Sequence, residues 1–201
     1  MSVARVAVTI SLKVKPLPRG GDSWKMPEIL KMLVMGLPKS GKTTFIKYVF
    51  GNEEFKEFEE YKPTFGVNIS LYEFKGLEGI MVSAFDCGGQ TSFIDTYMTD
   101  QWVPTLFGKV SLFLFLVDSS SKDILEEAVK LFHKYHENVK MNSPDAYTYV
   151  LATKWDKHSI LKDEIKTAFK DIQVCPISIL DGSALDIAKD VIDNALTRKE
   201  K

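Results

Sequence analysis

Residues 36–43 read Gly-Leu-Pro-Lys-Ser-Gly-Lys-Thr and fit the pattern G-x-x-x-x-G-K-[ST]. They lie between an apolar run at 29–35, which predicts a strand, and residues 42–50, which are typical of a helix. In that setting the backbone N–H groups of the loop point at phosphate oxygens. Lys42 adds a positive charge at the β- and γ-phosphates, and Thr43 offers a hydroxyl to Mg²⁺. We interpret the segment as a phosphate-binding loop; the alternative is a glycine-rich turn.

A second cluster of chemical groups follows the strand expected at 80–86. Asp86 ends that strand and can hold Mg²⁺, Gly89 lets its N–H approach a γ-phosphate, and Gln90 can orient an attacking water. Thr64 lies between the two motifs and can give its hydroxyl to the metal and its N–H to the γ-phosphate. Taken alone, each could be an ordinary turn or loop residue. Their order along the chain favours a nucleoside triphosphate site.

A third motif, Thr153-Lys-Trp-Asp156, closes the strand expected at 146–152. The carboxylate of Asp156 can accept two hydrogen bonds from the N1–H and exocyclic amine of guanine, whereas adenine presents the opposite pattern. The aliphatic stem of Lys154 can cover the face of the base. Residues 178–180, after the last expected strand, can support the base with a backbone N–H. A charged turn after a strand is the alternative.

Strands and helices alternate along the chain. Six strands are expected at 29–35, 67–74, 80–86, 110–118, 146–152 and 173–178, and helices at 42–50, 92–100, 121–139, 159–171 and 184–197. The apolar run 111–117 is typical of a strand covered on both faces. The helix at 121–139 has an apolar face made of Ile124, Ala128, Leu131, Phe132, Tyr135 and Val139. The pattern predicts an α/β fold, a six-stranded, mainly parallel sheet with helices on both faces.

Residues 29–197 resemble the Ras-like small GTPases, whose G-domain is a P-loop NTPase fold. The segment Asp-Cys-Gly-Gly-Gln90 with Phe93 and Tyr97, the wide spacing to Asp118, and Asn142-Ser-Pro-Asp-Ala146 look most like the Rag/Gtr branch. The phosphate loop Gly-Leu-x-x-x-Gly-Lys-Thr-Thr44 and the segment Pro63-Thr-x-Gly66 resemble instead the Arf branch. A divergent member between Rag and Arf would explain this mixture.

The resemblance implies phosphate and Mg²⁺ binding at the loop, a first switch at Thr64, a second at Asp86, Gly89 and Gln90, and guanine recognition at Lys154 and Asp156. The candidate catalytic residues are Gln90, Lys42 and Thr64, and the candidate metal ligands are Thr43, Thr64 and Asp86. The candidate nucleotide-binding residues are Gly36, Pro38, Lys39, Ser40, Gly41, Lys42, Thr43, Thr44, Thr64, Gly89, Thr153, Lys154, Asp156, Ser178, Ile179 and Leu180.

Three departures from the family pattern stand out. Thr153 occupies the position of the usual asparagine, which leaves open one bond between the base loop and the phosphate loop. Pro38 replaces a small residue beside the γ-phosphate; it is either tolerated there or limits the entry of an arginine from a partner. Rag proteins also carry a roadblock-like C-terminal domain, whereas this sequence ends near the last G-domain helix, so a Rag-style heterodimer is left open.

Composition places the chain among ordinary globular proteins. Apolar residues make up 45% and the net charge is −1, so there is no reason to invoke nucleic acid or an anionic membrane. Two cysteines do not suggest a disulfide framework, and a reducing cytosol is the simplest interpretation. We expect no direct membrane anchor, because the sequence lacks a myristoylation start, a prenylation cysteine and an uncharged apolar run of about 18 residues. Peripheral attachment through partners stays open.

Residues 1–28 form an expected N-terminal extension before the G-domain at 29–197, and residues 198–201 a C-terminal tail. Apolar residues alternate with others over 3–15, which is typical of a strand, and residues 15–22 are typical of a linker. The segment is either an ordered extra strand or a tail. If ordered, it should pair with a sheet edge or cover an apolar surface through its even-numbered face, and its truncation should lower stability or promote self-association.

The first functional hypothesis is a GTP-hydrolysing molecular switch that uses Mg²⁺ and is slow without an activating partner, because no built-in arginine finger is evident. The resemblance implies activating and exchange proteins and roadblock- or longin-type partners, with dimerisation left open. A non-hydrolysing GTP/GDP-binding scaffold that acts through partners is the alternative. An ATP phosphotransferase is disfavoured by Thr-Lys-Trp-Asp156.

Overall fold

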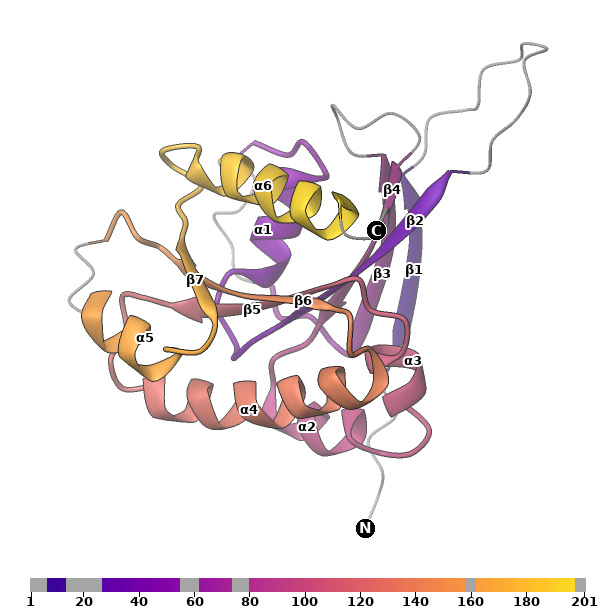
Figure 1. Ribbon diagram of the computed structural model, residues 1–201, viewed down its shortest axis with the longest axis horizontal. Helices are drawn as coiled ribbons and strands as arrows, with labels where there is room; N and C mark the ends of the chain where they lie inside the picture. Colours follow the sequence, from indigo (N-terminus) through magenta and orange to yellow (C-terminus); the bar gives the residue numbers. More distant parts are fainter. Residues whose placement is uncertain (1–6, 14–26, 55–61, 74–79, 158–161, 198–201) are drawn as a thin grey trace.

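The computed structural model describes residues 7–13, 27–54, 62–73, 80–157 and 162–197. The linker at 15–22, the tail at 198–201 and residues 159–161 of an expected helix lie outside these ranges. The described chain forms one mixed sheet with helices on both faces (Figure 1). The expected α/β architecture is therefore confirmed.

The sheet has seven strands rather than the six expected, in the order β1-β3-β4-β2-β5-β6-β7. The strands are β1 (Val8–Lys13), β2 (Glu28–Met35), β3 (Val67–Glu73), β4 (Ile80–Cys87), β5 (Leu112–Asp118), β6 (Tyr147–Thr153) and β7 (Gln173–Pro176). Among the strand pairs of the described residues, only β3–β4 is antiparallel. The added strand is β1, which pairs in parallel with β3 at the edge of the sheet.

Helices cover the sheet in two layers (Figure 1). One face packs against α1 (Lys42–Val49) and α6 (Ser183–Thr197). The other packs against α2 (Thr91–Tyr97), α3 (Val103–Phe107), α4 (Leu125–Asn142) and α5 (Lys162–Ala168). The expected helix at 92–100 thus ends at Tyr97, and the short α3, which begins next to Pro104, was not predicted. No helix among the described residues is long and apolar enough to cross a membrane.

The central strands form the core that holds the site. All seven residues of β5 are buried, as the apolar run predicts. The expected apolar face of α4 is confirmed, because Phe132 and Tyr135 pack with Phe113 and Phe115 of β5. Ile124, at the start of that face, precedes the helix and is half-buried. Parallel strands buried on both faces bring their carboxyl ends to one edge, where the three sequence motifs lie.

The expectation that the N-terminal segment pairs with an edge of the sheet is confirmed, but the pairing does not cover its even-numbered apolar face. The main chain of β1 pairs with β3, but Val8 and Ile10 are 46% and 70% exposed. Both side chains lie on the same face of the sheet as Val67 and Ile69, beyond the region that α2 and α3 cover. The strand therefore extends the sheet without burying its own apolar side chains.

Candidate functional site

The phosphate-binding loop joins the end of β2 to the start of α1, as the sequence predicts. Lys42 opens the helix, is 6% exposed and turns back over the loop, where its Nζ donates to the carbonyl oxygens of Gly36 (3.0 Å) and Leu37 (2.8 Å). Burial lowers the pKa of Lys42 to about 8, although the nearby Asp86 carboxylate opposes the shift. A buried ammonium beside a helix N-terminus is a strong site for an anion.

Two glycines let this loop pack against its neighbours. Gly36 has a φ of +147°, and a Cβ there would lie 2.3 Å from the carbonyl oxygen of Leu116 on β5. Gly89 follows β4, and a Cβ there would lie 2.5 Å from the carbonyl oxygen of Gly36 and 2.7 Å from the nitrogen of Pro38. Backbone from two distant parts of the sequence therefore meets at a separation that only glycine permits.

Three oxygen-bearing side chains converge beneath Lys42. The Thr43 hydroxyl donates to Oδ2 of Asp86 at 2.6 Å and lies 2.8 Å from the hydroxyl of Thr64. The Thr64 hydroxyl lies 3.4 Å from the same carboxylate oxygen. The structure thus brings together all three predicted metal ligands, which come from α1, the loop before β3, and β4.

The donor set fits Mg²⁺. Hydroxyl and carboxylate oxygens are the ligands this cation takes, usually one or two carboxylates with water and phosphate oxygens. Burial raises the pKa of Asp86, and hydrogen bonds from Thr43 and the charge of Lys42 only partly oppose it. Its other oxygen, Oδ1, is buried with no hydrogen-bond partner in the structure. A buried carboxylate with an unsatisfied oxygen is costly unless a cation pairs with it.

Gln90 lies at the N-cap of α2. With Leu37 and Pro38 it lines a cavity of about 500 Å³, whose outer wall includes Ile124 and Glu127. The glutamine and the unusual proline therefore share one water-accessible space next to the loop. Lys39, another candidate nucleotide-binding residue, is exposed on the loop with φ +62° and does not line this cavity.

A buried tyrosine joins the segments that carry Thr64 and Gln90, and the sequence did not indicate this role. The Tyr97 hydroxyl lies 2.9 Å from the carbonyl oxygen of Gly66 and 3.2 Å from that of Gly88. The N–H of Gly88 also donates to the carbonyl oxygen of Gly66 at 2.8 Å. The side chain is fully buried, so both carbonyls depend on protein groups for their hydrogen bonds.

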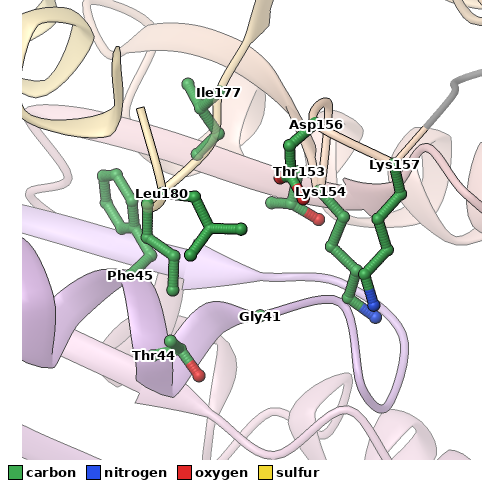
Figure 2. Close-up of a pocket in the computed structure, with 10 residues that line it drawn as sticks. Gly41, Thr44, Phe45, Thr153, Lys154, Asp156, Lys157, Ile177 and Leu180 are labelled. Atoms are coloured by element: carbon green, nitrogen blue, oxygen red, sulfur yellow. The ribbon is translucent and has the colours of Figure 1, made fainter. Parts of the chain in front are cut away.

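The base pocket is a cavity of about 200 Å³ between α1 and the loops after β6 and β7 (Figure 2). Apolar side chains form one side, and the polar residues that follow β6 form the other (Figure 2). The pocket is lined by Gly41, Thr44, Phe45, Thr153, Lys154, Asp156, Lys157, Ile177, Ile179 and Leu180. Of these, Phe45, Lys157 and Ile177 were not predicted, because they belong to no motif: Phe45 lies on α1, Lys157 follows Asp156, and Ile177 follows β7.

Asp156 is held in one orientation by Ser178. The Ser178 hydroxyl donates to Oδ1 of Asp156 at 2.6 Å and accepts from the N–H of Leu180 at 3.0 Å. A chain of hydrogen bonds therefore links the two segments that the sequence assigned to guanine. Asp156 also lines the base pocket.

Thr153 connects the base loop to the phosphate loop. Its hydroxyl lies 3.0 Å from the carbonyl oxygen of Ser40 and 3.1 Å from that of Val117, and can donate to either. The sequence left open whether the base loop and the phosphate loop are bonded when the usual asparagine is absent. The hydroxyl of Thr153 makes such a bond. Because Thr153 and Ser40 are 6% and 1% exposed, solvent does not compete for this contact.

Asp118 is a site residue that the motif search missed. Nζ of Lys154 donates to its Oδ2 at 2.5 Å, and Ser120 donates twice to its Oδ1. Burial opposes ionisation of Asp118, but these hydrogen bonds outweigh it and lower its pKa. The carboxylate thus fixes the lysine stem beside the base pocket. Its position at the end of β5, level with the other strand ends, was the available signal.

Comparison with known proteins identifies the family. Residues 31–187 match the model of the "Gtr1/RagA G protein conserved region". The chain belongs to the Gtr1/RagA family of G proteins.

Individual relatives of this Gtr1/RagA protein agree. It is 29% identical over 141 residues to Ras-related GTP-binding protein A of Dictyostelium discoideum, covering 70% of this chain and 45% of the relative. It is 30% identical over 134 residues to GTP-binding protein GTR1 of Saccharomyces cerevisiae, covering 67% and 42%. The chain therefore spans less than half the length of these relatives.

Arf-like proteins are also similar to this Gtr1/RagA protein, as the phosphate loop and first switch suggested. ADP-ribosylation factor-like protein 3 of S. cerevisiae is 26% identical over 192 residues, which cover 90% of each chain. Among solved structures, the Arl6 BBS3 small GTPase of Trypanosoma brucei superposes with a TM-score of 0.64 over 84% of this chain and 98% of its own. At 20% identity, this match supports the fold alone.

Proposed function

We propose that this Gtr1/RagA protein is a molecular switch that binds GTP and GDP and hydrolyses GTP with Mg²⁺. The observation that carries the proposal is the convergence of Thr43, Thr64 and Asp86 within 3.4 Å beneath Lys42. A site built only to hold a diphosphate needs no threonine from a separate loop. A residue that senses the γ-phosphate must lie at the metal site, and Thr64 does so.

Guanine selection rests on the second cavity. Asp156 would accept from the N1–H and the exocyclic amine of guanine, while Ser178 keeps its carboxylate turned toward the base. Lys154, held by Asp118, would cover one face of the ring with its aliphatic stem. Adenine would leave the carboxylate without donors, so ATP should bind far more weakly.

For hydrolysis, Gln90 would orient the water that attacks the γ-phosphate, and Lys42 would stabilise charge on the phosphate oxygens. Thr43, Thr64 and Asp86 would hold Mg²⁺, which would supply positive charge to offset the charge on the phosphate oxygens. The only arginines in the sequence are Arg5, Arg19 and Arg198, all outside the described residues. An arginine finger accelerates this reaction by about 10³–10⁵, so we propose slow hydrolysis until a partner supplies one.

Loss of the γ-phosphate would release Thr64 and Gly89, and the two loops would then present different surfaces to partners. We propose activating and exchange proteins, and roadblock- or longin-type proteins, as those partners. A cytoplasmic location, peripheral to a membrane through such partners, follows from this role. The support is membership of the Gtr1/RagA family.

The test begins with the nucleotide content of the purified, denatured protein, where GDP or GTP is expected. Competition between GTP and ATP then checks the base, and single-turnover hydrolysis checks the chemistry. Gln90→Leu should bind GTP like the wild type and hydrolyse it about tenfold more slowly or worse, a loss of at least about 1.4 kcal/mol of transition-state stabilisation. Equal competition by ATP would refute guanine selection. Tight GTP binding with no turnover would establish the scaffold alternative instead.

A further inference from the structure

In the part of the chain that the structure describes, β1 is the edge strand of the sheet. The N–H of Val67 donates to the carbonyl oxygen of Ala7 at 2.9 Å, which turns the backbone of Ala7 toward β3. Backbone groups alternate in direction along a strand, so those of Val8 and Ile10 point away from β3. Within the described ranges, no other strand lies beyond β1. The sheet therefore ends in a row of main-chain donors and acceptors that can pair with another strand.

This edge carries few of the features that usually prevent pairing. Natural edge strands carry charges, prolines or bulges that disfavour contact with another sheet. β1 reads Val-Thr-Ile-Ser-Leu-Lys, with no proline and with its one charge, Lys13, at the last position, and its register with β3 runs without a bulge. Val8 and Ile10 also expose apolar surface beside the open edge. Both observations favour a strand as the occupant of this edge.

The segment is complementary to itself when two copies run antiparallel. With Ile10 opposite Ile10, the two exposed Ile10 side chains meet on one face of the joined sheet, and Thr9 faces Ser11 on the other. In this register, the main-chain N–H and C=O groups of Val8, Ile10 and Leu12, which point away from β3, take the hydrogen-bonded positions of the pair. We propose that β1 pairs with β1 of a second copy of this chain about a two-fold axis at Ile10, joining the two sheets.

A two-fold contact of this kind is closed, because each copy uses the same edge and none remains free. The contact leaves the base pockets of both copies open, since they lie near β6 and β7 at the opposite end of the strand order. The start of β1 contacts the backbone of Gly66 and Val67, close to Thr64, but the proposed pairing uses the outer edge of β1, which faces away from β3. Dimerisation is thus compatible with nucleotide binding.

A disulfide scan tests the register in the full chain. The native Cys87 and Cys175 are both buried, so Ile10→Cys introduces an exposed thiol on an otherwise unreactive surface. In the proposed pair the two Cα atoms of residue 10 lie about 5.5 Å apart, within the range that a disulfide spans. Mild oxidation should give a covalent dimer. In the matched Val8→Cys variant the two Cα atoms of residue 8 would lie roughly 14 Å apart in the proposed pair, so no cross-link should form.

Proline tests the pairing without a cross-link. Ile10→Pro removes an N–H that faces away from β3, so β1 should stay in its own sheet while edge pairing is lost. Sedimentation at up to about 100 μM should show a dimer for the wild type and a monomer for Ile10→Pro, with unchanged nucleotide binding. In the control Ser11→Pro, the lost N–H faces β3, so the melting temperature should fall. A wild-type monomer throughout this range, a dimer that survives Ile10→Pro, or equal cross-linking at both cysteine positions would overturn the proposal.

Discussion

Replacing Thr153 by valine tests whether one hydroxyl couples the base loop to the phosphate loop. Valine has nearly the same shape but cannot donate to the carbonyl oxygens of Ser40 and Val117, which lie 3.0 and 3.1 Å from the hydroxyl. Leaving a buried acceptor without its donor costs about 1–3 kcal/mol. In a chain of this size that loss lowers the melting temperature by roughly 2–12 °C.

The assay for this prediction is thermal unfolding of the nucleotide-free protein, followed by GDP titration. Thr153→Ser is the matched control, because it loses a methyl group but keeps the hydroxyl. Both variants should be less stable than the wild type, but only Thr153→Val should also bind GDP more weakly, since Ser40 then loses its tie to β6. If the valine variant melts and binds like the wild type, the hydroxyl does not couple the loops.

Three further predictions concern the nucleotide. Asp156→Asn should weaken GTP binding by about tenfold or more and favour xanthosine nucleotides, whose 2-oxo group can accept from the amide; unchanged GTP affinity in a competition assay would remove the guanine assignment. Because burial lowers the pKa of Lys42 to about 8, its ammonium is lost as pH rises through that value, so GDP affinity should fall above pH 8. At pH 9, Lys42 should take up a proton when GDP binds, so calorimetry in two buffers with different ionisation enthalpies should give different heats of binding. Equal heats in the two buffers would contradict this prediction. Pro38→Gly should alter partner-stimulated hydrolysis more than intrinsic hydrolysis if the ring limits access to the cavity it shares with Gln90; equal effects on both rates, or none, would exclude that role.

Much of the fold follows from local patterns. The run at β5 is apolar throughout because both faces are covered, and such a run has few alternatives to a central strand. The phosphate loop is equally local, since its glycines, Lys42 and the following helix are contiguous. The convergence of Thr43 and Asp86 could also be predicted, because both lie at carboxyl ends of neighbouring parallel strands or just beyond them.

Other features depend on tertiary contacts that no local pattern specifies. Alternation predicts that the N-terminal segment can be a strand, but not that it pairs in parallel with β3 or leaves Ile10 exposed. The separate helix α3 follows Tyr97 too closely to be distinguished from a longer helix by its apolar spacing. The pair of Asp118 and Lys154 joins residues 36 positions apart. Its two members become neighbours only because β5 and β6 pair in register.

The buried hydroxyl of Tyr97 has a consequence for the timing of the switch. It serves the carbonyls of Gly66 and Gly88, one just after Thr64 and the other just before Gly89. If either segment moves away, the other loses part of the same hydrogen-bond network and is left with a buried, unsatisfied group. The two segments should therefore open and close as one cooperative unit. Spectroscopic probes placed separately near Thr64 and near Gln90 should then report a single shared relaxation rate after nucleotide hydrolysis.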